Sequence, residues 1–450
     1  MSACAPAHRS TGSRPAICLM AGALLSAAVS LPAHAARIEL GASAEEADVI
    51  VGCLYPMTGR AGTYGLDSVS GIEMALKDLA DEAATGLPVP KIRVVIDDPA
   101  SKASYGVRIA EDFLRNDHVQ VLCGMVSSGV AQAVSEVSRR EKVILIGTDH
   151  ASSRLTIEAG HRYYFRVTND SWTSMAAGAR YLRDLQARDG WTRLAFIGPD
   201  YDYGHVSWLD LQHALADLGV RYETVAELWP KLYEPDYSVY IAALQQAKPE
   251  IVVTAIWGGD FIAFVKQAAS TRFFETIRLA NFDTGANYDA LVALGDTPPP
   301  GLILSARHHN NWPETGRNQR FVRIFHDLNG RYPTYAAEGA YTGILAVARA
   351  VEIAGGAKDT EKLVEALEGL KLALPEDPPG FASYIDRDTH QIVQAMAVGT
   401  VVPDTRFPPA KVMVGNWAVY DAEDLKPSPE VIRRRRDAAR SGWESALPPP

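Results

Sequence analysis

The chain has 450 residues, a formal net charge of −10 at pH 7 and 47% hydrophobic residues. This length exceeds what one hydrophobic core normally supports, so we expect two domains or lobes. An acidic surface disfavours nucleic acid and anionic membranes as partners, because both are themselves negatively charged.

The first 35 residues have the pattern of a secretory signal peptide. Arg9 and Arg14 supply a basic region, the run AICLMAGALLSAAVSL is apolar, and Ala33-His34-Ala35 is typical of a cleavage site. The apolar run is shorter than the ~20 residues that a membrane span needs. We therefore expect residues 1–35 to be removed from a soluble, periplasmic protein.

Two of the four cysteines, Cys53 and Cys123, remain after such a cleavage. An exported protein favours a disulfide between them. Each cysteine lies in a predicted strand, however, and disulfides rarely join neighbouring parallel strands, so the sequence leaves both states open. No spacing of cysteine and histidine is typical of a zinc site, and we expect neither a metal nor a cofactor.

Short apolar segments alternate with helical patterns from residue 49 to residue 306. Such alternation is typical of parallel sheets covered by helices on both faces. It occurs in two series, which predict an α/β chain with two doubly wound parallel-sheet lobes. The predicted strands are residues 49–55, 91–97, 119–124, 143–147 and 163–167, then 193–198, 221–227, 250–257, 278–282 and 301–306; helical patterns lie near 65–84, 102–116, 129–141 and 171–188.

The remainder of the chain is different in pattern. Helical patterns occupy residues 318–330, 336–355 and 359–370, and a strand-like segment, QIVQAMAVGTVV, follows. The charge run VIRRRRDAAR, residues 431–440, predicts a solvated helix or tail rather than a binding patch.

The loops after the first, third and fourth predicted strands are where we expect a ligand. An open parallel sheet binds ligands beyond the carboxyl ends of its strands, where the strand order reverses. The first of these loops, PMTGRAGTYGLDS, places Tyr64 among three glycines but has neither a phosphate-binding nor a dinucleotide-binding spacing. An ordinary turn explains the glycines, whereas Tyr64 on a loop indicates a side chain that faces a ligand.

The second loop lies in VLCGMVSSGVAQAV, residues 121–134. A hydrolase nucleophile elbow reads Gly-x-Ser-x-Gly, but here Gly124 stands one residue too far from Ser128, and no spacing singles out a histidine partner. Ser127 or Ser128 instead suits the N-cap of a helix that begins near Gly129, where N–H groups and the helix dipole attract a carboxylate. A cap without any ligand, and a catalytic serine as a remote alternative, stay open.

The third loop, TDHASSRLT, supplies Asp149, His150 and Ala151 within a dense group of polar residues. These residues suit a ligand site or the N-cap of the next helix. Acid–base catalysis is disfavoured, because side chains adjacent in sequence point apart.

Several segments resemble, in order, the type I periplasmic solute-binding proteins of the leucine/isoleucine/valine-binding family, over residues 47 to about 400. The resemblance implies two lobes joined by three hinge crossings, which close on one small ligand. The matching segments are VIVGCLYPMTGRAGTYGLDSVSGIEMALKDL, VLCGMVSSGVAQAVSEVS, VILIGTDHASSRLT, YYFRVTNDSWTSMAAGARYL, IGPDYDYGHVSW, IVVTAIWGGDFIAFVKQA and YPTYAAEGAYTGILAVARAVEIAGG.

The resemblance also implies roles for residues at matching positions. Ser128 and the backbone around Asp149 and Ala151 hold the ligand carboxylate. The remaining expected contacts are Tyr64 and Tyr203, one from each lobe, the aromatic ring of Trp257, and Asp283 against a ligand ammonium. We expect lobe 1 at residues 47–167 plus 306–392, lobe 2 at 168–305 plus 393–425, and a C-terminal extension at 426–450.

The sequence also departs from the family pattern. The segment Asp149-His150-Ala151 is bulkier and lacks the usual threonine, and Asp283 is one methylene shorter than the usual glutamate. The ligand thus stays open among a branched-chain or other amino acid, an aromatic acid, a short amide and a urea-like solute. We expect a monomer that is no enzyme, does not bind nucleic acid, and works with a membrane ABC permease or, alternatively, a sensor protein.

Overall fold

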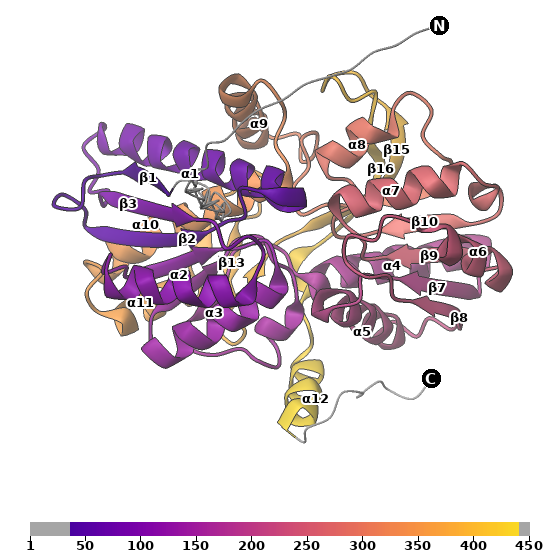
Figure 1. The fold of residues 1–450 in the computed structure, drawn as a ribbon, viewed down its shortest axis with the longest axis horizontal. Coiled ribbons are helices and arrows are strands. Elements are labelled where there is room, and N and C mark those ends of the chain that lie inside the picture. Colours follow the sequence, from indigo (N-terminus) through magenta and orange to yellow (C-terminus); the bar gives the residue numbers. More distant parts are fainter. Residues whose placement is uncertain (1–36, 441–450) are drawn as a thin grey trace, which may run out of the picture. The chain divides into compact units, whose positions relative to one another are not determined.

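The structure is a computed structural model that describes residues 37–440 (Figure 1). The predicted signal peptide lies outside these residues. Within the described range, no helix has both the length and the apolar character that a membrane crossing requires. The described chain forms two large sheets, each flanked by helices, which we call the first and second lobes.

The first lobe contains a six-stranded sheet in the order β1-β3-β2-β4-β5-β6. Its strands are parallel except β1, which runs antiparallel to β3. Helices α1, α10 and α11 cover one face, and α2 and α3 cover the other. The bounds are β1 Ile38–Gly41, β2 Val49–Leu54, β3 Ile92–Asp97, β4 Val121–Gly124, β5 Ile144–Gly147, β6 Tyr164–Arg166, α1 Gly62–Ala83, α2 Ala103–Arg115, α3 Ser128–Glu141, α10 Tyr335–Ala354 and α11 Thr360–Leu367.

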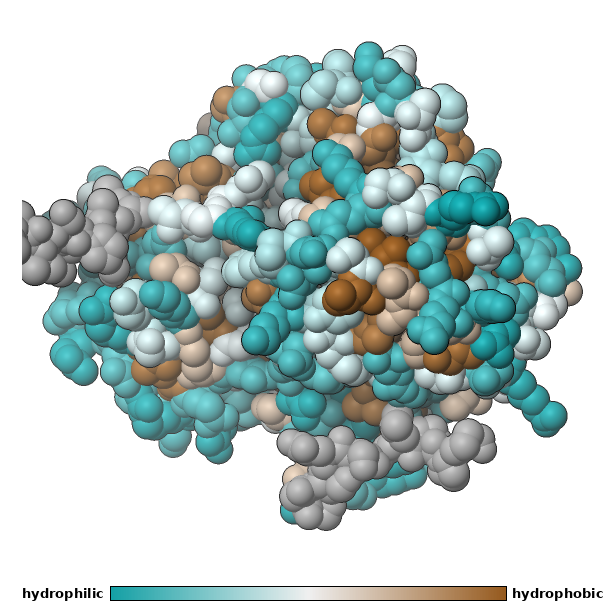
Figure 2. Space-filling model, turned by 45° about the vertical axis from the view of Figure 1, so that its right-hand side comes forward, coloured by the Kyte–Doolittle hydropathy of each residue, from teal (hydrophilic) through white to brown (hydrophobic). Residues whose placement is uncertain are grey.

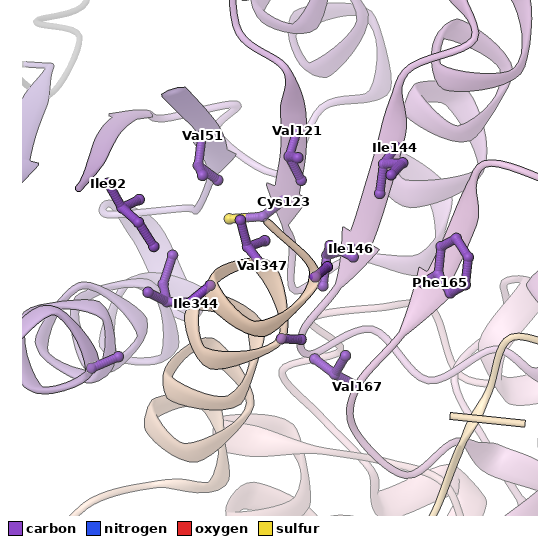
Figure 3. Close-up of a cluster of buried hydrophobic side chains, with 14 of the residues drawn as sticks. Val51, Ile92, Val121, Cys123, Ile144, Ile146, Phe165, Val167, Ile344 and Val347 are labelled. Carbon is purple, nitrogen blue, oxygen red and sulfur yellow. The ribbon is translucent and has the colours of Figure 1, made fainter. Parts of the chain in front are cut away.

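The core of the first lobe is built from strand residues that alternate between its two faces. Val121 and Cys123 of β4 pack against α10, whereas Leu122 between them packs against α2 and α3. Figure 3 shows Ile344 and Val347 of α10 beside the strand side chains. Burial on both faces explains why the strands read as continuous apolar runs in the sequence.

The second lobe contains a seven-stranded sheet in the order β16-β15-β11-β10-β9-β7-β8. Strands β7 to β11 are parallel, and β15 and β16 add an antiparallel edge. Helices α4 and α5 cover one face, and α6, α7 and α8 cover the other. The bounds are β7 Arg193–Ile197, β8 Glu223–Leu228, β9 Ile251–Thr254, β10 Arg278–Asn281, β11 Leu302–Leu304, β15 Met396–Pro403, β16 Val412–Tyr420, α4 Ser171–Asp189, α5 Asp202–Asp217, α6 Ser238–Ala247, α7 Gly258–Ala269 and α8 Tyr288–Leu294.

The strand order confirms the predicted α/β fold with two doubly wound sheets. In each sheet the first strand of the series pairs with the second and the third, so the order reverses beside it. The chain passes between the lobes after β6, after β11 and after β14, as the resemblance implied. The exact lobe boundaries stay a prediction. The remaining elements are α9 Gly316–Asn329, the small sheet of β12 Lys371–Leu372, β13 Ser383–Ile385 and β14 Ile392–Val393, and α12 Pro429–Arg440.

The exposed face in Figure 2 carries hydrophobic residues interspersed among hydrophilic ones. The large exposed hydrophobic residues of the described chain come from different elements, which is normal for folded proteins. They are Leu66, Leu87, Val239, Leu328, Ile353 and Val419.

A disulfide joins Cys53 and Cys123, which settles the question that the sequence left open. The two residues are register partners on the neighbouring parallel strands β2 and β4, and their Cα atoms lie 4.4 Å apart. This distance is at the short end of the range that disulfides span. The bridge therefore links the two strands whose loops diverge where the sheet order reverses.

Helix α12 corrects the prediction of a solvated charge run, because Arg435 is only 2% exposed. Its Nε donates to Glu158 at 2.9 Å, and its Nη1 pairs with Asp210 at 2.5 Å. Glu158 follows β5 in the first lobe, whereas Asp210 belongs to α5 in the second lobe. One arginine of the run thus compensates a buried acid from each lobe.

We expect Arg435→Ala to lower the free energy of unfolding by about 3–5 kcal/mol, because it leaves buried carboxylates without their cation. Urea unfolding followed by circular dichroism measures the change. Arg433→Ala is the matched control, since Arg433 is exposed on the same helix. Equal stability of the two variants would contradict the assigned role of Arg435.

We expect the double substitution Cys53→Ala/Cys123→Ala to lower the free energy of unfolding by about 2–4 kcal/mol, because the unfolded chain gains the freedom of an open loop. The two cysteines are 70 residues apart. Urea unfolding of the wild type with reductant provides the control and should approach the midpoint of the variant. A midpoint unaffected by both changes would show that the bridge adds no stability.

Candidate functional site

A small cavity lies between the two lobes at the carboxyl ends of their central strands. Its volume is about 10 Å³, which is close to the space that a single water molecule needs. The lobes are therefore closed on each other in this structure. The lining residues are Val126, Ser128, Asp149, Ala151 and Tyr335 from the first lobe, and Tyr201, Tyr203, Trp257, Thr284 and Arg307 from the second.

Larger hollows occur elsewhere on the described surface. One of about 490 Å³ lies between residues 156–162 and α12, and another of about 470 Å³ lies beside the crossing at residues 391–394. Neither lies at the carboxyl ends of the large sheets. We assign the ligand site by position rather than by volume, because parallel sheets bind ligands at the strand ends where the order reverses.

The start of α3 forms one wall of the cavity. The helix begins at Ser128, and Ser127 occupies the N-cap position, where its side chain makes no capping hydrogen bond. Ser128 is buried, and its hydroxyl accepts a hydrogen bond from the backbone N–H of Ser152 at 3.3 Å. The first N–H groups of a helix lack partners within the helix and attract anions. Ser128 lines the cavity as predicted, whereas Ser127 does not.

Asp149 and His150 point to different surroundings. Asp149 lines the cavity, while the imidazole of His150 lies 3.0 Å from the carbonyl oxygen of Met125 and 2.7 Å from the hydroxyl of Tyr164. Burial lowers the pKa of His150 to about 3. The ring is therefore neutral at pH 7 and is already engaged on both nitrogens, so it is not placed to activate Ser128.

The carboxyl group of Asp149 is buried and incompletely paired. Its Oδ1 accepts a hydrogen bond from Arg307 at 3.2 Å, but Oδ2 has no hydrogen-bond partner among the described residues. Burial raises the pKa of Asp149 to about 7, although the Arg307 charge opposes this rise. Asp149 thus exchanges its proton close to neutral pH.

Asp283 does not face the cavity as an open ammonium partner. Its carboxylate accepts two hydrogen bonds from Arg307, at 2.9 and 2.7 Å, and one each from the hydroxyls of Ser174 and Tyr203, at 2.8 and 2.5 Å. Burial acts to raise the pKa of Asp283, but the charge and hydrogen bonds of Arg307, together with the hydroxyls of Tyr203 and Ser174, hold this pKa below its usual value. Four donors fill the acceptor sites of a carboxylate. The structure therefore assigns Asp283 to holding Arg307.

Aromatic rings occupy the second-lobe wall and the contact between the lobes. Trp257 precedes α7 and donates from its indole N–H to the hydroxyl of Tyr201 at 3.1 Å. Tyr64 lies in the first turn of α1 rather than on a loop, and its hydroxyl accepts a hydrogen bond from Asn287 of the second lobe at 3.1 Å. Tyr64 therefore joins the lobes beside the cavity. The ring of Tyr335 packs against that of Tyr64, with 5.5 Å between the ring centroids.

Further polar contacts hold the closed lobes together. The hydroxyl of Ser152 donates to Asp202 at 2.5 Å, and Arg60 pairs with Asp260 at 3.1 Å. Each of these contacts joins the first lobe to the second. Within the described chain, no group of three or more acidic, histidine or cysteine side chains is arranged to hold a metal ion.

Several lining residues differ from those that the sequence predicts. Arg307 follows β11, so the rule that ligands bind beyond the carboxyl ends of strands is the signal that could have found it. No comparable signal marks Tyr335, which lies at the start of α10. Lining residues outside the prediction are Val126, Tyr201, Thr284, Arg307 and Tyr335.

We expect Asp283→Asn to lower the free energy of unfolding by about 3–5 kcal/mol, because Arg307 loses its main buried counter-charge. The double variant Asp283→Asn/Arg307→Met removes both charges and should recover most of this loss. Urea unfolding of the three proteins measures the coupling. A double variant as unstable as the single one would contradict a dominant charge pair.

Comparison with known proteins identifies the family of this chain. The sequence profile of the family described as periplasmic binding protein matches residues 48–406. A protein of Brucella suis named Leu/Ile/Val-binding protein homolog 1 is 31% identical over 342 residues, which cover 75% of this chain and 86% of that protein. The resemblance seen in the sequence is thereby confirmed.

Solved structures of solute-binding proteins share the fold. One from Rhodopseudomonas palustris, in complex with 3,4-dihydroxybenzoic acid, has a TM-score of 0.71 at 23% identity and covers 83% of this chain and 97% of its own. A branched-chain amino acid transporter protein of that species has a TM-score of 0.68 at 23% identity and covers 84% and 98%. On the profile match and the Brucella relative, this chain belongs to the periplasmic binding protein family.

Proposed function

We propose that this protein is the periplasmic substrate-binding component of an ABC uptake system and captures a small carboxylated solute by closure of its lobes. The observation that carries the proposal is the start of α3 at Ser128, which forms a cavity wall opposite aromatic residues of the second lobe. A helix N-terminus favours a bound anion by its N–H groups and its dipole. Closure then surrounds the solute with residues from both lobes.

The proposed contacts follow from the cavity wall. Ser128 and the backbone from Asp149 to Ala151 hold the carboxylate on the first lobe. Tyr203 and Trp257 contact the remainder of the solute from the second lobe, and all of these residues line the cavity. Tyr64 joins the lobes when they close, through its hydrogen bond with Asn287.

The lobes must open before a solute can bind, because the cavity of about 10 Å³ is too small for any organic solute to enter. The hydrogen bonds between the lobes, such as Ser152 to Asp202, must break for the solute to enter and form again around it. Lobe closure about a hinge is a known binding motion of two-lobed proteins. A small-angle scattering curve that stays the same with and without every tight ligand would contradict this mechanism.

The solute class is open between two chemistries that related proteins represent. The Brucella relatives are named for leucine, isoleucine and valine, whereas fold neighbours from Rhodopseudomonas palustris were solved with benzoate or 4-hydroxybenzoate. A thermal-shift screen over amino acids, aromatic acids, short amides and urea separates them. Tight ligands stabilise the folded protein by mass action, so the melting temperature rises with ligand concentration.

We expect Ser128→Ala to weaken the tightest carboxylate found in the screen by about tenfold or more, because a hydrogen bond to a charged group contributes about 1.5–3 kcal/mol. Isothermal titration measures the change in Kd. Ser127→Ala is the matched control, since its side chain neither caps α3 nor lines the cavity. An unchanged Kd in Ser128→Ala, or no ligand at all in the screen, would overturn the proposed site.

A further inference from the structure

The charges around the cavity are unequal. Two acids, Asp149 and Asp283, and one cation, Arg307, are buried there, with exposed fractions of 2%, 0% and 6%. Asp283 takes two of the hydrogen bonds that Arg307 donates, while the carboxylate of Asp149 receives one, at 3.2 Å. When Asp149 is ionised, one negative charge in the cavity wall therefore has no counter-charge of its own.

One oxygen atom of Asp149 lacks a hydrogen-bond partner within the described part of the chain. Oδ2 of Asp149 is buried, lacks a hydrogen-bond partner among the described residues, and belongs to a residue that lines the cavity. Buried polar atoms are normally paired in folded proteins, so an unpaired one needs an explanation. A hydrogen-bond donor on the solute would be the partner of this oxygen.

The surrounding wall suits a cation. The rings of Tyr201, Tyr203, Trp257 and Tyr335 line the same cavity. Aromatic faces attract cations, and Arg307 already lies 4.6 Å from the ring centroid of Tyr335.

The anion-binding helix start and Asp149 are close enough in the fold to serve one small molecule. Ser128 follows β4 and Asp149 follows β5, and these two strands are parallel neighbours whose ends are in register at Gly124 and Gly147. A solute whose carboxylate meets the start of α3 can therefore reach Asp149 with a second group.

We propose that the solute is a zwitterion whose protonated amine pairs with Asp149 while its carboxylate meets the start of α3. This inference rests on the proposed function, because it concerns the same cavity. It moves the ammonium contact from Asp283, which Arg307 occupies, to the fourth-strand loop of the first lobe. It also favours amino acids and amino-substituted acids over simple aromatic acids such as benzoate.

Proton release accompanies this binding mode. The charged and titratable groups around Asp149 are Arg307 and Asp283 from the second lobe, Asp67 of α1, and the phenols of Tyr55, Tyr64 and Tyr335. Because burial raises the pKa of Asp149 to about 7, part of the ligand-free protein holds a proton there at neutral pH. An ammonium beside the carboxylate lowers that pKa again, so binding releases the proton. Affinity for an amine should rise as pH rises towards 7 and level off above it.

The test compares ligands that differ in one group. Leucine is paired with 4-methylpentanoate, and phenylalanine with 3-phenylpropanoate, alongside the other amino acids, benzoate and 4-hydroxybenzoate. Isothermal titration at pH 6, 7 and 8, in two buffers of different protonation enthalpy, gives both Kd and the number of protons released. We expect the tightest ligand to carry an amine, its loss to weaken binding about tenfold or more, and proton release near pH 7.

Asp149→Asn removes the charge and keeps the shape of the side chain. It should weaken the amino acid about tenfold or more and abolish proton release. It should not weaken the amine-free acid, because it removes a negative charge near the bound carboxylate. Asp202→Asn is the matched control, because Asp202 contacts Ser152 across the lobes but does not line the cavity. This control should affect both ligands by the same factor.

Different outcomes separate the two proposals. Tighter binding of benzoate, or of either amine-free acid, than of any amino acid would overturn the zwitterion and leave the solute-binding function intact. The zwitterion would also be overturned if Asp149→Asn and the wild type preferred the amino acid over its amine-free analogue by the same factor. This ratio of Kd values is measurable even if the variant is less stable. Absence of binding for every acid and amino acid tested would overturn both proposals.

Discussion

Arg307 lies between two buried acids, and the arrangement of the cavity depends on this one cation. It is fixed by Asp283, which in turn is held by Ser174 and Tyr203 of the second lobe. Its Nη1 also donates to the backbone oxygen of Asp149 in the first lobe. The guanidinium is therefore a contact between the lobes as well as a charge, and moving the lobes apart changes the electrostatic surroundings of Asp149.

The position of Arg307 in the chain gives this contact added weight. The residue lies just after β11, where the chain returns from the second lobe to the first. Backbone rotation at such a crossing accompanies hinge motion in two-lobed proteins. Arg307 thus belongs both to the crossing and to the cavity wall. A change in the backbone conformation of the crossing therefore moves a charge in the cavity wall.

The sequence was informative where the signal is local. Continuous apolar runs such as VLCG identify strands buried on both faces, and the glycine–serine step after that run correctly places Ser128 at the cavity. The glycines around Tyr64 predict a turn, whereas helix α1 begins at Gly62 and includes both Tyr64 and Gly65. Helix boundaries depend on hydrogen bonds that glycine content alone does not reveal.

The sequence failed where the interaction joins distant residues. Arg307 and Asp149 are 158 positions apart, and nothing near either residue indicates the other. The charge run predicts a solvated Arg435, because the partners that bury this residue, Glu158 and Asp210, lie more than 200 residues earlier. The disulfide stayed open for a similar reason, since only the register of β2 and β4 brings Cys53 beside Cys123.

The pairing of Arg307 with Asp283 constrains how this cavity can change in evolution. Loss of either residue alone leaves a buried charge without its partner, which lowers the stability of the folded protein far more than loss of both residues. A lineage that frees the acid at position 283 for a solute must therefore lose the arginine at position 307 at nearly the same time. Solute preference in such proteins would shift by paired substitutions, and positions 283 and 307 should covary when related sequences are compared.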